Sequence, residues 1–156
     1  MEDMPLELEP LDQSAFDQFM AALRVRYVHD RERSNLLSTQ EAEQFTDQQW
    51  ASILPDGRNT EGHHFFKLVD SGRRIGASWV FIDAATDAAF IYELFLEEDE
   101  RGKGFGRKAL DALQQFSKSQ GAKTLALNVF ANNLRARKLY DSFGFAPVST
   151  DMIKPI

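Results

Sequence analysis

Cysteine is absent from the 156 residues of this chain. Its absence excludes disulfides, thiolate-bound zinc, iron–sulfur clusters and a catalytic cysteine. Long apolar runs are also absent, since nothing approaches the roughly 18 residues that a membrane helix needs. Residues 1–5 lack the basic segment and apolar core of a secretion signal. We therefore expect a cytoplasmic protein with no membrane partner.

Basic residues are fewer than acidic residues: the chain has 18 Lys and Arg against 24 Asp and Glu, which gives a formal net charge of −6. Nucleic-acid-binding surfaces are basic, so we expect no nucleic-acid partner. A hydrophobic fraction of 43% is ordinary for a globular protein. At roughly 100–200 residues per domain, the sequence predicts a single domain over residues 1–156.

Local patterns predict helices and strands in an order typical of an α+β fold. Ser38 and Glu41 have the spacing of a capping box, which indicates the start of a helix. A helix between two strands of the C-terminal half is the crossover that a parallel strand pair requires. The expected strands are 6–10, 64–70, 75–83, 88–96, 124–130 (of the buried kind) and 146–153; the expected helices are 12–30, 38–54, 104–120 and 133–143.

A glycine-rich loop lies between strand 88–96 and helix 104–120. Its three glycines, within residues 102–106, let the backbone approach a ligand closely. The first N–H groups of the following helix favour an anion. Four cations reverse the overall sign of the chain at this point: Arg101, Lys103, Arg107 and Lys108. The loop predicts a ligand with phosphates; the alternative is a flexible turn with a solvated charge run.

Residues 104–109 also fit the G-x-G-x-x-A pattern of dinucleotide-binding folds. That fingerprint needs its first glycine directly after the strand, and an acid roughly 20 residues later. Here seven residues separate Leu96 from Gly104, and strand 124–130 contains neither Asp nor Glu. The context therefore disfavours a dinucleotide site.

The loop resembles the coenzyme A pyrophosphate loop of the GNAT (N-acetyltransferase) superfamily through its Arg-x-x-Gly-x-Gly pattern at residues 101–106. Asn-x-x-Ala-x-x-Leu-Tyr at 133–140 and Gly-Phe at 144–145 are similar to later motifs of that family. Segments 90–96 and 128–145 resemble an uncharacterised bacterial branch. The resemblance implies a mixed, mostly antiparallel sheet with helices on both faces and a splayed parallel strand pair at the coenzyme site.

The resemblance also implies acetyl-CoA as the acetyl donor and assigns its binding residues. The backbone of Phe95 and Leu96 would pair with the pantetheine arm, and an N–H near Phe95 would polarise the acetyl carbonyl. Asn133, which could cap the last helix, would contact the coenzyme through that helix start. The pyrophosphate would bind the backbone of the loop: Arg101, Gly102, Lys103, Gly104, Phe105, Gly106 and Arg107.

Two residues are candidates for proton transfer. Tyr140 matches the general acid of the family motif, since a phenol with a pKa near about 10 can protonate a leaving thiolate. The alternative is a tyrosine packed in the core. Glu93 is the only acid in strand 88–96 and is the candidate base. Its alternatives are a carboxylate that points into solvent or one that only binds a cationic substrate.

These observations predict an N-acetyltransferase that moves an acetyl group from acetyl-CoA to a primary amine by direct transfer, since no cysteine can form an acyl-enzyme. The acceptor would be a small molecule or a peptide, and a homodimer is expected by analogy only. The alternative is a coenzyme A-binding sensor or interaction module on the same fold. We expect no metal, because the adjacent His63 and His64 would face opposite ways along a strand.

Overall fold

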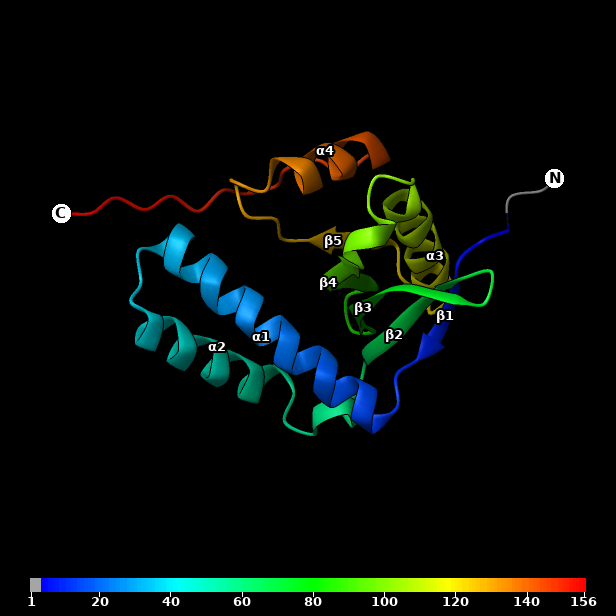
Figure 1. Cartoon of the computed structure of the whole chain (residues 1–156), viewed down its shortest axis with the longest axis horizontal. Helices are drawn as coiled ribbons and strands as arrows, with labels where there is room; N and C mark the ends of the chain where they lie inside the picture. Colours follow the sequence, from blue (N-terminus) through cyan, green and yellow to red (C-terminus); the bar gives the residue numbers. More distant parts are fainter. Residues whose placement is uncertain (1–3) are drawn as a thin grey trace. The chain divides into compact units, whose positions relative to one another are not determined.

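A computed structural model describes residues 4–156 of the chain (Figure 1). Contacts between residues group the chain into two compact units. The sheet unit comprises residues 4–13 and 61–128, and the helical unit comprises residues 14–60 and 129–156. The single domain expected over residues 1–156 stays a prediction.

The sheet unit is built on five strands in the order β1-β2-β3-β4-β5 (Figure 1). Neighbouring strands are antiparallel from β1 to β4, and β5 runs parallel to β4. The strands are β1 (Glu7–Pro10), β2 (His63–Asp70), β3 (Arg73–Asp83), β4 (Ala88–Leu96) and β5 (Thr124–Leu127). The predicted α+β class, with a mostly antiparallel sheet and one parallel pair, is confirmed.

The helix α3 (Phe105–Ser119) connects β4 to β5 and packs on one face of the sheet. Its apolar residues recur every three to four positions, so one side of the helix is buried and the other is charged. Phe105 and Ala109 of this helix share a core with three residues of the sheet unit: Leu6, Leu68 and Ile75. This face of the sheet is called the α3 face below.

The helical unit contains α1 (Gln13–Asn35), α2 (Thr39–Ile53), the short turn Gly57–Asn59 and α4 (Leu134–Phe143). The capping box that begins α2 is present: the Glu41 N–H donates to Ser38 Oγ (3.2 Å), and the Ser38 N–H donates to Glu41 Oε2 (2.8 Å). Between the helices, Arg24 on α1 donates to both carboxylate oxygens of Asp47 on α2, at 2.8 and 2.9 Å.

Three expectations need correction. The strand expected over residues 124–130 ends at Leu127, and it lies at the sheet edge with exposed and half-buried positions in alternation, so it is not of the buried kind. The first helix continues to Asn35. The strand expected over residues 146–153 is not formed. Pro147 offers no backbone donor there, and Val148 is 97% exposed, so this segment has neither a ladder nor a buried face.

A helix that crosses a membrane must be both long and apolar, which can be checked for α1 to α4. Within residues 4–156, none of them is both long and apolar enough to cross a bilayer.

Candidate active site

A β-bulge in β4 determines how the site residues of the sheet unit are presented. Trp79 on β3 lies opposite Glu93, but the next residue, Val80, lies opposite Ile91. Tyr92 is therefore an extra residue in the ladder, as in a bulge where two residues oppose one. The Tyr92 ring stacks on the Trp79 ring, with centroids 4.4 Å apart. The bulge thus places Tyr92 and Glu93 together on the face of the sheet that carries Trp79.

This face is the one opposite α3. Strand residues alternate between faces, and Leu94, the neighbour of Glu93, packs in the core on the α3 face. Phe65 on β2 lies opposite Trp79, and their rings are 5.2 Å apart. We call the face that carries Phe65, Trp79, Tyr92 and Glu93 the aromatic face.

Glu93 is half-buried, as its place in a central strand requires. Its Oε1 atom accepts a hydrogen bond from the Leu94 N–H at 3.0 Å. The carboxylate is therefore directed along β4 towards the next residue, and the hydrogen bond from the Leu94 backbone restrains its position.

The parallel pairing between β4 and β5 ends before β4 does. Its last paired residues are Ile91 and Leu127, whereas β4 continues to Leu96. The residues predicted to pair with the pantetheine arm, Phe95 and Leu96, lie in this continuation. The last five residues of β4 therefore have no partner in β5, which ends at Leu127; the splaying that the resemblance implied stays a prediction.

The end of β4 is held by a glycine on β3 and by an arginine after the strand. A Cβ atom at Gly76 would lie 2.0 Å from the Phe95 carbonyl oxygen, so only glycine fits. Arg101 Nε donates to the Leu96 carbonyl oxygen at 3.1 Å, and its guanidinium lies 5.6 Å from the centre of the Phe95 ring. The side chain of Arg101 therefore fixes the strand end, a role that the sequence did not predict.

The glycine-rich loop has the backbone form that its sequence predicts. Gly102 and Gly104 have φ values of 76° and 84°, in the left-handed region that favours glycine. Gly104 is the N-cap of α3, and no side chain caps the helix there. The open helix start attracts anions. The Arg101 N–H donates to the Glu98 carbonyl oxygen at 3.3 Å, so this group is already paired within the loop.

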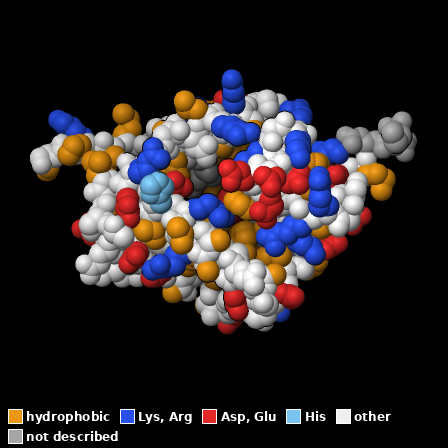
Figure 2. Space-filling view, in the orientation of Figure 1, with side chains coloured by type: hydrophobic (Ala, Val, Ile, Leu, Met, Phe, Trp, Pro, Cys, Tyr) orange, Lys and Arg blue, Asp and Glu red, His pale blue; other side chains and the backbone are white. Residues whose placement is uncertain are grey.

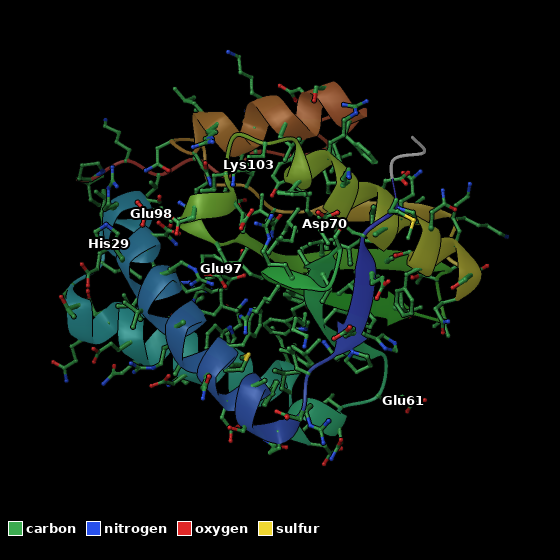
Figure 3. All side chains as sticks on the ribbon, turned by 45° about the vertical axis from the view of Figure 1, so that its right-hand side comes forward. His29, Glu61, Asp70, Glu97, Glu98 and Lys103 are labelled. Carbon is green, nitrogen blue, oxygen red and sulfur yellow. The ribbon has the colours of Figure 1, made fainter. Side chains whose placement is uncertain are left out.

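Acidic partners offset much of the positive charge of this loop. Glu100, whose side chain is 10% exposed, binds Arg73 at 3.1 Å and Lys103 at 3.4 Å. The Nζ atom of Lys108 lies 3.8 Å from the Oδ1 atom of Asp70, the last residue of β2. Acidic and basic side chains lie side by side on the face in Figure 2, and Figure 3 labels Asp70 and Lys103. Because some of the cations are paired with acids, we expect the backbone N–H groups of the loop to contribute more to anion binding than the number of cations alone would suggest.

Asn133 and Tyr140 belong to the helical unit. Asn133 caps α4, because its Oδ1 atom accepts from the Ala136 N–H at 3.2 Å, as its place in the sequence suggested. Tyr140 is half-buried on α4, and its ring meets Phe145 edge to face with centroids 5.8 Å apart. The Tyr140 carbonyl oxygen accepts from the Phe145 N–H at 3.0 Å, which ends the helix at the Gly-Phe pair.

His63 and His64 face opposite ways, as expected for neighbours in a strand. His63 stacks on Phe81 on the aromatic face, with centroids 4.4 Å apart. His64 meets Phe116 of α3 on the other face, at 5.0 Å. Within residues 4–156, no three His, Asp or Glu side chains lie together as metal ligands would.

Sequence comparison defines the class of protein. The model of the acetyltransferase (GNAT) family matches residues 23–145. The chain therefore belongs to the GNAT family of acetyltransferases, as its motifs suggested.

Its relatives include bacterial proteins of the same length. The uncharacterized N-acetyltransferase YycN of Bacillus subtilis (strain 168) is 32% identical over 157 residues, which cover 98% of this chain and 100% of YycN. The uncharacterized N-acetyltransferase YdgE of the same organism is 31% identical and covers 98% of this chain and 99% of YdgE. The crystal structure of YycN matches with a TM-score of 0.90 over 97% of this chain and 98% of that chain.

Proposed function

We propose that this protein moves an acetyl group from acetyl-CoA to a primary amine by direct transfer. The observation that carries the proposal is the end of β4, which continues beyond its pairing with β5 and is followed by a glycine-rich loop that begins a helix. An extended pantetheine arm can pair with such a strand end as an added strand would. The loop then offers its N–H groups to the pyrophosphate.

Membership of the GNAT family supports the same donor. A fold neighbour with 14% sequence identity, AAC(6')-Iy, was solved in complex with the bisubstrate analogue CoA-S-monomethyl-acetylneamine. Another relative, over 40% of this chain, is a spermine/spermidine N(1)-acetyltransferase of Bacillus subtilis. The name of this relative describes acetylation of an amine, which is why we propose an amine acceptor.

The reaction needs one base and one acid. In the proposed mechanism Glu93, directly or through a water molecule, takes one proton from the ammonium form of the acceptor and passes it to solvent, and it takes a second proton from the nitrogen as the amide forms. The amine nitrogen forms a bond to the acetyl carbon, and the bond from that carbon to sulfur breaks. The leaving thiolate takes a proton from Tyr140. A backbone N–H near Phe95 stabilises the oxyanion that forms between these steps; one such donor is worth about 2.7–4 kcal/mol in other enzymes.

The aromatic face fits an amine substrate. Tyr92 and Glu93 are neighbouring, half-buried residues of the bulge, and an aromatic ring and a carboxylate both attract a cationic amine before it is deprotonated. Burial raises the pKa of the Tyr92 hydroxyl, so this group stays neutral at physiological pH.

Two experiments test the proposal in order. Thermal unfolding with and without acetyl-CoA measures binding, and we expect a rise in Tm at millimolar ligand. Release of coenzyme A thiol over a panel of amines then measures turnover; the chain has no cysteine of its own to react with the thiol reagent. Absence of a Tm shift would refute donor binding. A shift without turnover on any amine would favour the coenzyme A-binding module instead of the enzyme.

A further inference from the structure

His63 is held in one protonation form by a buried neighbour. Trp79 is fully buried, and its Nε1–H donates to His63 Nδ1 at 2.9 Å. An indole N–H can only donate, so Nδ1 must be the unprotonated nitrogen and Nε2 must carry the hydrogen of the neutral ring. The hydrogen bond therefore fixes the tautomer of His63.

The orientation of the ring is fixed as well. His63 lies nearly parallel to Phe81, with centroids 4.4 Å apart and planes 24° apart. The Tyr92 ring, beside Glu93 in the bulge, is 5.8 Å away. Within residues 4–156, no side chain or carbonyl accepts a hydrogen bond from Nε2 of His63. A positioned donor thus remains without a protein acceptor on the aromatic face.

The charge of His63 follows from its surroundings. Burial, with a smaller contribution from His64, lowers the pKa of His63 to about 4. The ring is therefore neutral at physiological pH, so it donates at Nε2 and neither repels a cationic amine nor removes its proton.

We propose that His63 is a specificity residue of the acceptor site, and that its Nε2–H selects amines whose skeleton carries a hydroxyl or carbonyl oxygen. The inference rests on the proposed function, because it places the acceptor amine at Glu93. His63 lies on β2 and Glu93 on β4, two strands away, and their β3 partners Phe81 and Trp79 are two residues apart, so the two backbones are roughly 12 Å apart. The oxygen is therefore several bonds from the amine, as in an amino sugar, a longer amino alcohol or a peptide.

A polyamine lacks the group that His63 requires. Its second ammonium has hydrogens to donate but no lone pair to accept the Nε2–H. A site built around a donor rejects a ligand that leaves this donor unpaired. The proposal thus predicts an acceptor that differs from the amine in the name of the spermine/spermidine acetyltransferase among its relatives.

Two acceptors of equal length test the proposal: 5-amino-1-pentanol and 1,5-diaminopentane. We expect kcat/KM to be about 10-fold higher for the amino alcohol, because only its oxygen can accept from Nε2. His63→Phe keeps a flat ring on Phe81 and removes the donor, so it should bring the two values close together. His64→Phe, on the α3 face, is the matched control and should keep the preference.

A result without turnover still tests the proposal. Long-range 15N NMR spectra of the histidine rings should show hydrogen on Nε2 of His63 in the free protein, and Trp79→Phe should abolish this single tautomer. Addition of 5-amino-1-pentanol together with acetyl-CoA should shift the Nε2 resonance, whereas the diamine should not.

Three outcomes would overturn the proposal: equal or better use of the diamine, an equal loss of both activities in His63→Phe, or an Nε2 resonance that the amino alcohol leaves unchanged. Failure of the proposed function is a separate result, namely no Tm shift with acetyl-CoA. If His63→Phe does not fold, His63→Gln offers an amide donor in place of the imidazole and should retain part of the preference.

Discussion

Gly76 on β3 and Phe95 on β4 approach so closely that the Phe95 carbonyl oxygen occupies the space of a side chain at position 76. The neighbouring Leu96 backbone is also within 3.1 Å of that space. Since both contacts are to backbone atoms, a side chain at this position can fit only if the end of β4 moves. This end of the strand is the segment proposed to pair with the coenzyme.

Gly76→Ala should therefore affect stability and coenzyme binding together. We expect a loss of about 1–3 kcal/mol in the free energy of unfolding, as for overpacked cores, and weaker binding of acetyl-CoA by the folded fraction. Urea unfolding and titration calorimetry measure the two effects. Gly72→Asn is the control, because nothing lies within 4 Å of a Cβ there and Asn tolerates its φ of +78°. Unchanged coenzyme affinity in Gly76→Ala would contradict the assignment of this strand end.

Arg101→Met should weaken coenzyme binding more than it weakens the fold. The variant removes the hydrogen bond to the Leu96 carbonyl oxygen and the contact with the Phe95 ring. A net hydrogen bond is worth about 0.5–1.5 kcal/mol, so we expect the Kd for acetyl-CoA to rise by about 2- to 10-fold. Arg58→Met, in the Gly57–Asn59 turn of the helical unit, serves as the control. An equal rise in both variants would mean that overall charge, not the held strand end, determines affinity.

Tyr140→Phe should lower kcat and leave coenzyme affinity nearly unchanged. The phenol supplies a proton to the leaving thiolate in the proposed mechanism, and general acids contribute about 10²–10⁴-fold. The ring contact with Phe145 survives the substitution, so the fold should survive as well. Stopped-flow thiol release measures the effect, and Tyr27→Phe on α1 is the matched control. Full turnover in Tyr140→Phe would assign the acid to another group.

Stability should fall as the pH drops below about 6.5. Burial lowers the pKa of His63 to about 4 and lowers the pKa of His64 from its ordinary value of 6.5. At pH values between the lowered pKa of the folded chain and the ordinary pKa of 6.5, these histidines bind protons in the unfolded chain but not in the folded chain. The free energy of unfolding therefore rises with pH in this range. Above both pKa values the contribution is complete and the dependence ends.

Urea unfolding at pH 7 and pH 5.5 measures this dependence while carboxylates remain largely ionised. His63→Phe should reduce the difference between the two pH values. Thr46→Ala, which removes a hydroxyl buried in the helical unit, should lower stability at both pH values by the same amount. A pH dependence that His63→Phe leaves intact would show that His63 titrates as it does in the unfolded chain.

Local patterns predicted most elements because their causes are local. The capping box of Ser38 and Glu41 begins α2 within its own four residues, and Gly102 and Gly104 of the loop adopt the left-handed conformation that glycine adopts freely. The strand expected over residues 146–153 was wrong for the converse reason. A strand needs a neighbour to pair with, and the alternation of side chains does not supply one.

Non-local contacts explain what the sequence could not predict about the site. The bulge at Tyr92 arises from the register of β4 on β3. The sequence of β4 alone predicts a regular strand. The close approach at Gly76 and the Trp79–His63 hydrogen bond likewise join different strands. The four cations of the loop could be recognised in the sequence, but the pairing of two of them, Lys103 with Glu100 and Lys108 with Asp70, depends on the fold.

The early end of the β4–β5 pairing has a consequence for self-association. The unpaired edge of a strand can form hydrogen bonds with a strand of another molecule, and proteins usually protect such edges with bulges, charges or a covering segment. Here the bulge at Tyr92 and the acids that follow Leu96 lie at the two ends of the segment beyond Ile91. Under the proposed function, a coenzyme bound along this segment would cover it as a further strand. The protein should then be most prone to aggregate when it is depleted of coenzyme, and acetyl-CoA would act as its chemical chaperone.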